Sequence, residues 1–285
     1  MKYVYFGTPQ FAVTVLDELT LAGFPPALIV TSPDKPAGRK LILTPSPVKL
    51  WAAERNIPII TPEKLREESV VTQLRAISAD VFIVAAYGKL IPQSILDLPS
   101  HGTINVHPSL LPLLRGPSPI ESAIAGGLTQ TGVSIMLLDA DMDHGPIIAQ
   151  EKYAEDWSKE NPPKGSFLEH ALAHQGGKLL AKILPAWISG TLHATEQQHA
   201  LATFCAKITK EDGRIDITSD PFAAIAKIRA YDVWPGTFFF VQHAGRDIRV
   251  RISDAHINDG KLVIDKVIPE GKKEMQYADF LRGLK

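Results

Sequence analysis

Residues 101–120 read His-Gly-Thr-Ile-Asn-Val-His-Pro-Ser-Leu-Leu-Pro-Leu-Leu-Arg-Gly-Pro-Ser-Pro-Ile, and this stretch guides the interpretation of the whole chain. Thr103 to Val106 alternates as a strand does. Asn105 and His107 lie two residues apart, so their side chains would project from the same face of that strand. Pro108 ends the strand because it has no N–H group to donate. Ligands of open α/β sheets bind beyond the carboxyl ends of strands, so the pair is well placed for chemistry.

The segments on either side alternate between strand and helix patterns. Apolar runs predict strands at residues 2–6, 27–31, 57–60, 80–86, 131–138 and 147–153. Helix starts are predicted at Thr8, Ser46, Thr61, Ser118 and Ser166, each followed by a proline or by a glutamate that would complete a capping box. This order predicts an α/β fold with a doubly wound, mostly parallel, Rossmann-like sheet. Only one glycine, Gly7, follows the first strand, so we expect no nicotinamide cofactor.

Composition sets limits on partners and compartment. The chain has 285 residues, of which 45% are hydrophobic and 21% are charged, as in one large or two medium globular domains. A formal net charge of −1 means that contact with nucleic acid would require a local basic patch. The single cysteine, Cys205, favours a reducing compartment, so we expect a cytoplasmic protein. Because no run of ~18 apolar residues occurs, we expect no membrane partner.

The pattern changes in the last third of the chain. From Phe204 onward, short alternating segments at 236–242, 247–252 and 261–267 are separated by turn residues, with one helix at 221–230. These segments predict a small OB-like β-barrel. Residues 191–203 are polar and contain two histidines, His193 and His199, which predicts a solvated linker. We therefore predict a catalytic domain at 1–189, a linker at 190–203 and a barrel domain at 204–285.

Two loops carry candidate binding residues. Residues 32–46 are rich in proline and contain Lys35, Arg39 and Lys40, so they form either a solvated surface loop or an arm that grips a polyanion. The Tyr87-Gly88 pair follows the strand at 80–86. Its exposed backbone could contact the planar ring of a ligand, or the pair could form an ordinary turn.

Three acids, Asp139, Asp141 and Asp143, lie close together after the strand at 131–138. Acids at alternate positions are typical of calcium loops. The continuation lacks the bidentate glutamate and the glycine register of an EF-hand, so we expect no metal.

The motif Asn-Val-His-Pro-Ser-Leu-Leu-Pro at 105–112, with Asp-Met-Asp-His-Gly-Pro-Ile at 141–147, resembles the formyltransferases that use 10-formyltetrahydrofolate. The resemblance implies that this folate is the co-substrate. It implies catalytic roles for Asn105, His107 and Asp143, and folate contacts at Tyr87, Gly88, Ser109, Leu110, Leu111 and Pro112. Formyl transfer passes through a tetrahedral oxyanion, to which an amide and a protonated imidazole can donate. A carboxylate near the imidazole can orient it and collect protons.

Both ends of the chain resemble the members of this family that formylate initiator methionyl-tRNA. The matching stretches are Pro-Asp-Lys-Pro-Ala-Gly-Arg at 33–39, Cys-Ala-Lys-Ile-Thr-Lys-Glu-Asp-Gly-Arg-Ile-Asp at 205–216 and Arg-Ala-Tyr-Asp-Val-Trp-Pro-Gly at 229–236. The implied tRNA contacts are Lys35, Arg39, Lys40, Lys207 and Lys210. One departure is Leu113-Leu114, where members commonly carry a basic and then an aromatic residue.

The expected activity is transfer of the formyl group of 10-formyltetrahydrofolate to the α-amino group of methionyl-tRNA, for translation initiation, by a monomer. Three alternatives remain open at this point: a formyltransferase for a sugar nucleotide or other small amine, a formyltetrahydrofolate hydrolase, and an RNA-binding module with a relict site.

Overall fold

The computed structural model describes residues 1–38, 41–243 and 245–284. Arg39 and Lys40, two of the predicted tRNA contacts, lie outside these described residues. The chain divides into two compact units. Unit 1 comprises 1–115, 132–152 and 170–204, and unit 2 comprises 116–131, 153–169 and 205–285. Within the described ranges, no helix has both the length and the apolar character needed to cross a bilayer.

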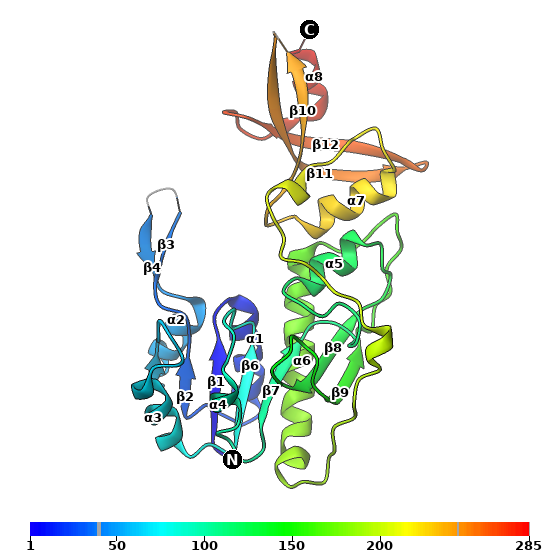
Figure 1. Cartoon of the computed structure of the whole chain (residues 1–285). Helices are drawn as coiled ribbons and strands as arrows, with labels where there is room; N and C mark the ends of the chain where they lie inside the picture. Colours follow the sequence, from blue (N-terminus) through cyan, green and yellow to red (C-terminus); the bar gives the residue numbers. More distant parts are fainter. Residues whose placement is uncertain (39–40, 244, 285) are drawn as a thin grey trace. The chain divides into compact units, whose positions relative to one another are not determined.

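Unit 1 is built on a seven-stranded sheet in the order β5-β2-β1-β6-β7-β8-β9 (Figure 1). Its strands are β1 (Tyr3–Gly7), β2 (Leu28–Val30), β5 (Ile59–Ile60), β6 (Val81–Ala85), β7 (Thr103–His107), β8 (Gly132–Leu137) and β9 (Ile147–Lys152). The first five in spatial order are parallel, whereas β8 and β9 join antiparallel. This arrangement confirms the predicted mostly parallel sheet. The strand order reverses between β1 and β6, the switch point beside which open α/β sheets bind ligands.

Helices cover this sheet because its strands are apolar on both faces. They are α1 (Gln10–Leu21), α2 (Pro47–Glu54), α3 (Glu68–Ile77), α4 (Gln93–Leu96) and most of α6 (Gly165–Ile188). Alternate residues of β1, Val4 and Phe6, pack in one buried cluster with Leu74 of α3 and Ile95 of α4. Tyr5 points the other way, and its hydroxyl donates to the carbonyl of Ala12 in α1 at 2.8 Å.

A pair of glycines lets α6 approach its neighbours closely. A Cβ atom at Gly176 would lie 2.6 Å from Cγ1 of Val106 in β7, and one at Gly177 would lie 2.6 Å from Cβ of Glu18 in α1. Both distances are shorter than real side-chain contacts. The two glycines therefore fix where this helix lies against the strand that carries His107.

Several helix starts differ from the prediction. The Ser46 cap is confirmed, since its hydroxyl accepts from the Lys49 N–H at 3.1 Å. Helix α1 begins at Gln10, and the Thr8 hydroxyl donates instead to the Tyr87 carbonyl at 3.1 Å. Helix α3 begins at Glu68, not near Thr61.

The two predicted capping boxes are also wrong. The Ser118 hydroxyl makes no capping hydrogen bond to α5 (Pro119–Ala125), and it donates to the carbonyl of Ala206 at 2.5 Å. The Ser166 hydroxyl donates to Oδ2 of Asp232 at 2.5 Å. Ser166 also lies inside α6, which begins at Gly165, and is not its cap.

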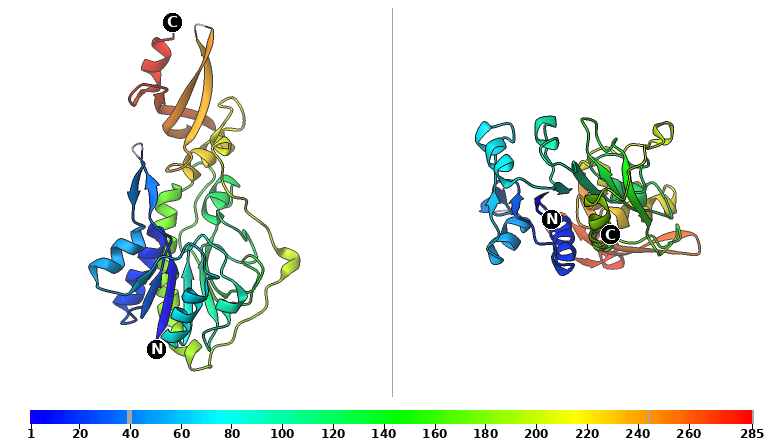
Figure 2. Two further views of the ribbon diagram at one scale, coloured as in Figure 1. Left: turned by 60° about the vertical axis from the view of Figure 1, so that its left-hand side comes forward. Right: turned by 90° about the horizontal axis from the view of Figure 1, so that it is seen from below.

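The segment predicted as a loop at 32–46 contains a β-hairpin. Strand β3 (Lys35–Ala37) pairs antiparallel with β4 (Ile42–Thr44), and Pro36 lies opposite Leu43. Pro36 is tolerated because a two-stranded ribbon has an unpaired edge. Figures 1 and 2 show the hairpin projecting past the end of the sheet where β1 and β2 finish. Ile42 and Leu43 are exposed on it.

Unit 2 contains a four-stranded antiparallel sheet in the order β10-β11-β12-β13. Its strands are β10 (Thr237–His243), β11 (Arg246–Asn258), β12 (Lys261–Pro269) and β13 (Met275–Gln276), packed with α7 (Pro221–Ala230) and α8 (Tyr277–Arg282) around a core that includes Ile225, Phe239 and Val250. The predicted C-terminal β domain is confirmed as an antiparallel sheet domain, and its predicted helix at 221–230 is confirmed. Across the described residues, the strand order is open, with no β10–β13 pairing that would close it into a barrel.

Candidate active site

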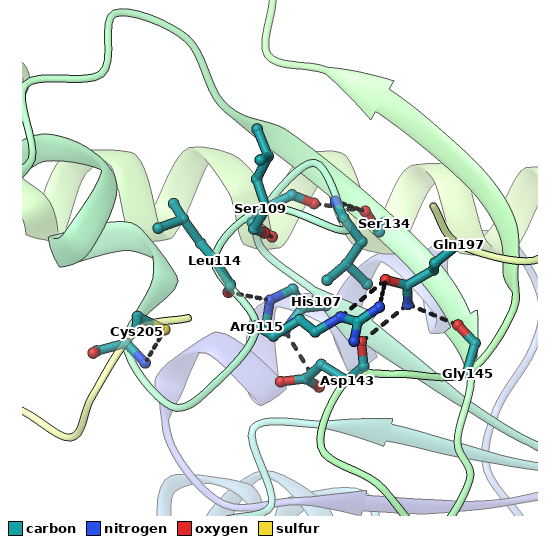
Figure 3. Close-up of polar contacts among 12 residues, drawn as sticks. His107, Ser109, Leu114, Arg115, Ser134, Asp143, Gly145, Gln197 and Cys205 are labelled. Carbon is teal, nitrogen blue, oxygen red and sulfur yellow. Dashed lines mark hydrogen bonds and ion pairs between the residues drawn. The ribbon is translucent and has the colours of Figure 1, made fainter. Parts of the chain in front are cut away.

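His107 is the last residue of β7 and is almost fully buried. Its Nε2 lies 3.0 Å from the carbonyl oxygen of Leu114, and its Nδ1 lies 3.6 Å from Oδ1 of Asp143 (Figure 3). The Asp143 side chain is only 13% exposed, so water screens this pair weakly. Two segments that are distant in sequence therefore meet the two ring nitrogens of one histidine.

These contacts constrain the protons of His107. A carbonyl oxygen can only accept, so Nε2 must carry the hydrogen. If the ring were neutral, the Nδ1 lone pair would then face a carboxylate oxygen, and two acceptors would oppose each other. The arrangement therefore places a carboxylate beside the Nδ1 edge of the ring and a carbonyl beside its Nε2 edge.

Gln197 holds the backbone on both sides of this pair. Its Nε2 donates to the carbonyl oxygens of Asp143 at 2.9 Å and Gly145 at 2.7 Å. Its Oε1 accepts from Nη2 and Nε of Arg115 at 2.7 and 3.1 Å. Arg115 follows Leu114, so Gln197 links the two segments that contact His107 (Figure 3).

Sequence reasoning missed both Gln197 and Arg115. The prediction that 191–203 is a solvated linker is wrong at Gln197, whose exposed fraction is 5%. Its amide is buried because it forms hydrogen bonds with Arg115 and with the loop of Asp143 and Gly145. The only available signal was a charged residue, Arg115, directly after an apolar Leu-Leu pair.

The predicted folate-contact loop has its own internal bonding. The Ser109 hydroxyl donates to the carbonyl of Leu113 at 2.6 Å, and the Leu111 N–H donates to the Ser134 hydroxyl at 3.0 Å. The Leu111 carbonyl accepts from Gln150 at 2.7 Å. Leu110 and Pro112 are half-buried in the same loop. These groups shape the loop beside His107.

The remaining predicted site residues lie within β7 and just after β6. Asn105 is half-buried, and its side chain makes no hydrogen bond to any residue that the structure describes. Tyr87 is buried with its ring edge-on to Phe6, and burial raises the pKa of its hydroxyl to about 12. Gly88 is exposed with φ of +77°, a conformation that favours glycine.

Of the three crowded acids, only Asp143 contacts His107. Asp139 instead accepts from His144 at 2.7 Å and from the Asp141 N–H at 3.0 Å, and Asp141 is exposed. Over the described part of the chain, no group of three or more His, Cys, Asp or Glu side chains is arranged to hold a metal ion.

The predicted basic contacts are spread over both units. Lys35 is exposed on the hairpin of unit 1, and Lys207 and Lys210 are exposed in unit 2. None of the three forms an ion pair with the described residues.

The chain matches the family described as Formyl transferase over residues 1–172 and the family described as Formyl transferase, C-terminal domain, over residues 207–261. Its similarity to methionyl-tRNA formyltransferase from Chloroflexus aurantiacus is 41% identity over 270 residues, covering 94% of this chain and 84% of the relative. The enzyme of the same name from Myxococcus xanthus is 37% identical over 307 residues, covering 100% and 95%.

Among solved structures, methionyl-tRNA formyltransferase from Clostridium thermocellum has the same fold, with a TM-score of 0.60 and 17% identity over 97% of this chain and 99% of that one. The sheet and its buried His–Asp pair therefore belong to a formyl transferase. More particularly, the chain belongs to the methionyl-tRNA formyltransferase family.

Proposed function

We propose that the chain transfers the formyl group of 10-formyltetrahydrofolate to the α-amino group of initiator methionyl-tRNA. The observation that carries the proposal is the buried contact of His107 with Asp143, found in a chain of this family. The alternative small-amine substrates receive no support from an individual feature of the site. The reaction would place the chain in the cytoplasm, where initiator tRNA is used, and we expect it to act as a monomer.

In the proposed reaction, the amine nitrogen of methionyl-tRNA attacks the formyl carbon, and the carbonyl oxygen becomes an oxyanion. The bond from carbon to N10 of the folate then breaks, N10 takes up a proton, and the attacking nitrogen loses one. The products are formylmethionyl-tRNA and tetrahydrofolate. The protein must therefore supply donors to the oxyanion and a route for one proton.

Asn105 and His107 are the proposed donors. The Asn105 amide is not engaged by the described residues. The Nε2–H group of His107 now donates to the neutral carbonyl of Leu114, and an oxyanion is the stronger acceptor, so it would take over that bond. Asp143 would hold the Nδ1–H side and stabilise the imidazolium, as well as receive the amine proton directly or through water.

The proposed folate contacts are Tyr87, Gly88 and the loop Ser109, Leu110, Leu111 and Pro112. Gly88 has no side chain, and apart from its two chain neighbours no heavy atom of the described residues lies within 4 Å of the position of a Cβ there. A planar ring can approach such a backbone. The proposed tRNA contacts are Lys35, Arg39, Lys40, Lys207 and Lys210. The proposed domains are a catalytic domain at 1–189 and a C-terminal domain at 204–285, joined by a linker at 190–203.

The test is incubation of the protein with 10-formyltetrahydrofolate and initiator methionyl-tRNA, followed by analysis of the acid-precipitated RNA and of released formate. Formylmethionyl-tRNA is expected. Release of formate alone would assign a hydrolase, and absence of both products would refute the proposed activity.

A further inference from the structure

Unit 2 contains a cavity of about 80 Å³ between α7 and the strands β10 and β11. Its lining includes Lys164, Arg229, Asp232, Thr237, Arg251 and Ser253. One water needs roughly 10–15 Å³ of such volume, so this phosphate-sized cavity holds several waters or one small oxyanion.

Three polar atoms in this lining are buried without a partner among the described residues. They are Nε of Arg229, Oγ1 of Thr237 and Oγ of Ser253. Thr237 is 99% buried, given its exposure of 1%. Buried polar groups are almost always paired in native proteins, so three such atoms in one cavity indicate a missing partner. The guanidinium can only donate, and both hydroxyls can donate, so that partner is an acceptor.

The lining of the cavity contains more cations than carboxylates. Lys164, Arg229 and Arg251 form no ion pair within the described chain. Of the two carboxylates in the lining, Asp232 already accepts from the Ser166 N–H and hydroxyl, and Asp254 is the other. Within the lining, three cations face two carboxylates, while Glu121 and Glu169 interact with Asp232 from outside the lining. Guanidinium groups suit phosphate because their N–H donors match its oxygens in geometry.

The backbone is adapted to this lining. Pairing between β11 and β12 passes from Ile252–Val267 to Asp254–Lys266, so Ser253 is the extra residue of a β-bulge. Bulges redirect side chains and are common near functional sites. Gly236 has φ of +73°, and a Cβ there would lie 3.2 Å from Cδ of Arg251. A side chain at this position would therefore crowd the arginine.

A second, open groove of about 520 Å³ shares Lys164 and Arg229 with the cavity. Its lining includes the aromatic residues Tyr153, Trp157 and Phe167, of which Phe167 is exposed, together with the acids Glu155 and Asp156. Aromatic rings beside cationic side chains are the combination with which proteins bind single-stranded nucleic acid, by stacking bases and pairing phosphates.

We propose that the cavity binds one phosphate group of the RNA substrate and that the aromatic groove stacks an unpaired base next to it. This inference rests on the proposed function, which supplies the RNA. It adds a specific phosphate and base site in unit 2 to the lysines already named.

The experiment measures initiator tRNA binding to the full-length protein at several salt concentrations. Thr237→Val removes a donor with little change in shape, and we expect roughly tenfold weaker binding with a thermal midpoint that is not lowered. Arg229→Gln should also lower the salt slope by about 0.7–0.9. Trp157→Leu should weaken binding about tenfold and leave the slope unchanged, because stacking releases no counterion. Lys272→Gln, an exposed residue outside both linings, is the matched control.

A separate titration with inorganic phosphate distinguishes the sources of the anion. If Thr237→Val abolishes phosphate binding but leaves tRNA binding intact, the cavity is a site for free phosphate and the RNA assignment is overturned. If neither ligand responds to any variant, the cavity holds water only and the inference fails. Weakened tRNA binding in Thr237→Val and Arg229→Gln, with Lys272→Gln unchanged, supports it.

The same samples separate this inference from the proposed function. Normal formylation with variant-insensitive tRNA binding would remove the cavity site alone. Variant-sensitive tRNA binding without any formyl transfer by the native protein would remove the proposed activity and retain the RNA site.

Discussion

Leu114 and Asp143 both adopt left-handed backbone conformations, with φ of 58° and 49°, and both contact the imidazole of His107. Side-chain-bearing residues rarely adopt this conformation, which costs on the order of 1–3 kcal/mol each. The surrounding bonds sustain it: the Leu114 N–H donates to the Thr203 hydroxyl at 2.8 Å, and Gln197 binds the Asp143 carbonyl. Such strain concentrates at functional sites, which agrees with the roles proposed for this pair.

The first prediction concerns the carboxylate. Asp143→Asn keeps the shape of the side chain and removes its charge, so the imidazolium of His107 loses its stabilising partner. We expect turnover to fall by about 10²–10⁴, the usual range for an acid–base partner. The Michaelis constants for folate and tRNA should change little, because the lost interaction acts in the transition state. Steady-state kinetics measures both.

Asp141→Asn is the matched control, since Asp141 is exposed in the same loop and is not in contact with His107 in the structure. Its effect should be small. Near-normal turnover in Asp143→Asn, together with loss of turnover in Asp141→Asn, would show that the wrong carboxylate has been assigned.

The second prediction concerns Gln197. Gln197→Glu keeps an acceptor for Arg115 but places a carboxylate oxygen against the carbonyls of Asp143 and Gly145. The loop that carries Asp143 should move, and a displacement of about 1 Å is enough to cost on the order of 10² in turnover. Gln198→Glu, its exposed neighbour, should retain activity. Equal activity of the two variants would contradict a positioning role for Gln197.

The sequence predicted those parts of the fold that local patterns determine. Apolar runs predicted β1, β6 and β7, because strands that are buried on both faces consist mainly of apolar residues. Ser46-Pro47 predicted the start of α2, because proline is favoured at the first position of a helix. It failed where a distant partner decides the structure. Ser118 and Ser166 have the residues of capping boxes, yet Ala206 and Asp232 accept their hydroxyls.

The same distinction applies to the candidate site. His107 and Asp143 were predicted because a family motif names them, and the structure brings their side chains to 3.6 Å. Gln197 lies in a polar segment whose composition suggests solvent, and its burial depends on two loops that only the folded chain brings together. The left-handed conformation of Leu114 likewise follows from the bonds of its neighbours, since leucine has no local preference for it.

The third prediction concerns the hairpin. Lys35 is exposed on β3, and a phosphate contact by this residue would release about one counterion. Lys35→Gln should raise the Michaelis constant for tRNA and lower the salt slope of binding by about 0.7–0.9, with the folate constant unchanged. Lys182→Gln, an exposed lysine on α6, serves as the control. Identical salt slopes for native protein and Lys35→Gln would argue against a tRNA contact at Lys35.

The last prediction concerns the pH dependence of stability. Burial is the main cause that raises the pKa of Glu121 in the first turn of α5, opposed by a backbone hydrogen bond and reinforced by Asp232. The pKa of Glu169 is raised by burial and then by Glu121 and Asp232. Unit 2 therefore contains a group of acids that repel each other when they are all ionised.

A carboxyl whose pKa is raised by folding binds its proton more tightly in the folded protein. Its contribution to stability is present at low pH and is lost as pH rises from its ordinary value near 4.5 through the raised folded value. Glutamine resembles the protonated form and cannot ionise. Glu121→Gln should therefore raise the thermal midpoint at pH 7–8, by about 2 °C, and the gain should shrink to nothing below about pH 4.

Circular dichroism melts of native protein and Glu121→Gln across this pH range measure the difference. Glu270→Gln, an exposed residue of the same unit, removes one negative charge without relieving buried repulsion and should give a flat difference. A loss of stability in Glu121→Gln at neutral pH would mean that the hydrogen bond to its ionised carboxylate outweighs the cost of burial. In that case the pKa of Glu121 would be lowered by folding, and the contribution of Glu121 to stability would increase with rising pH.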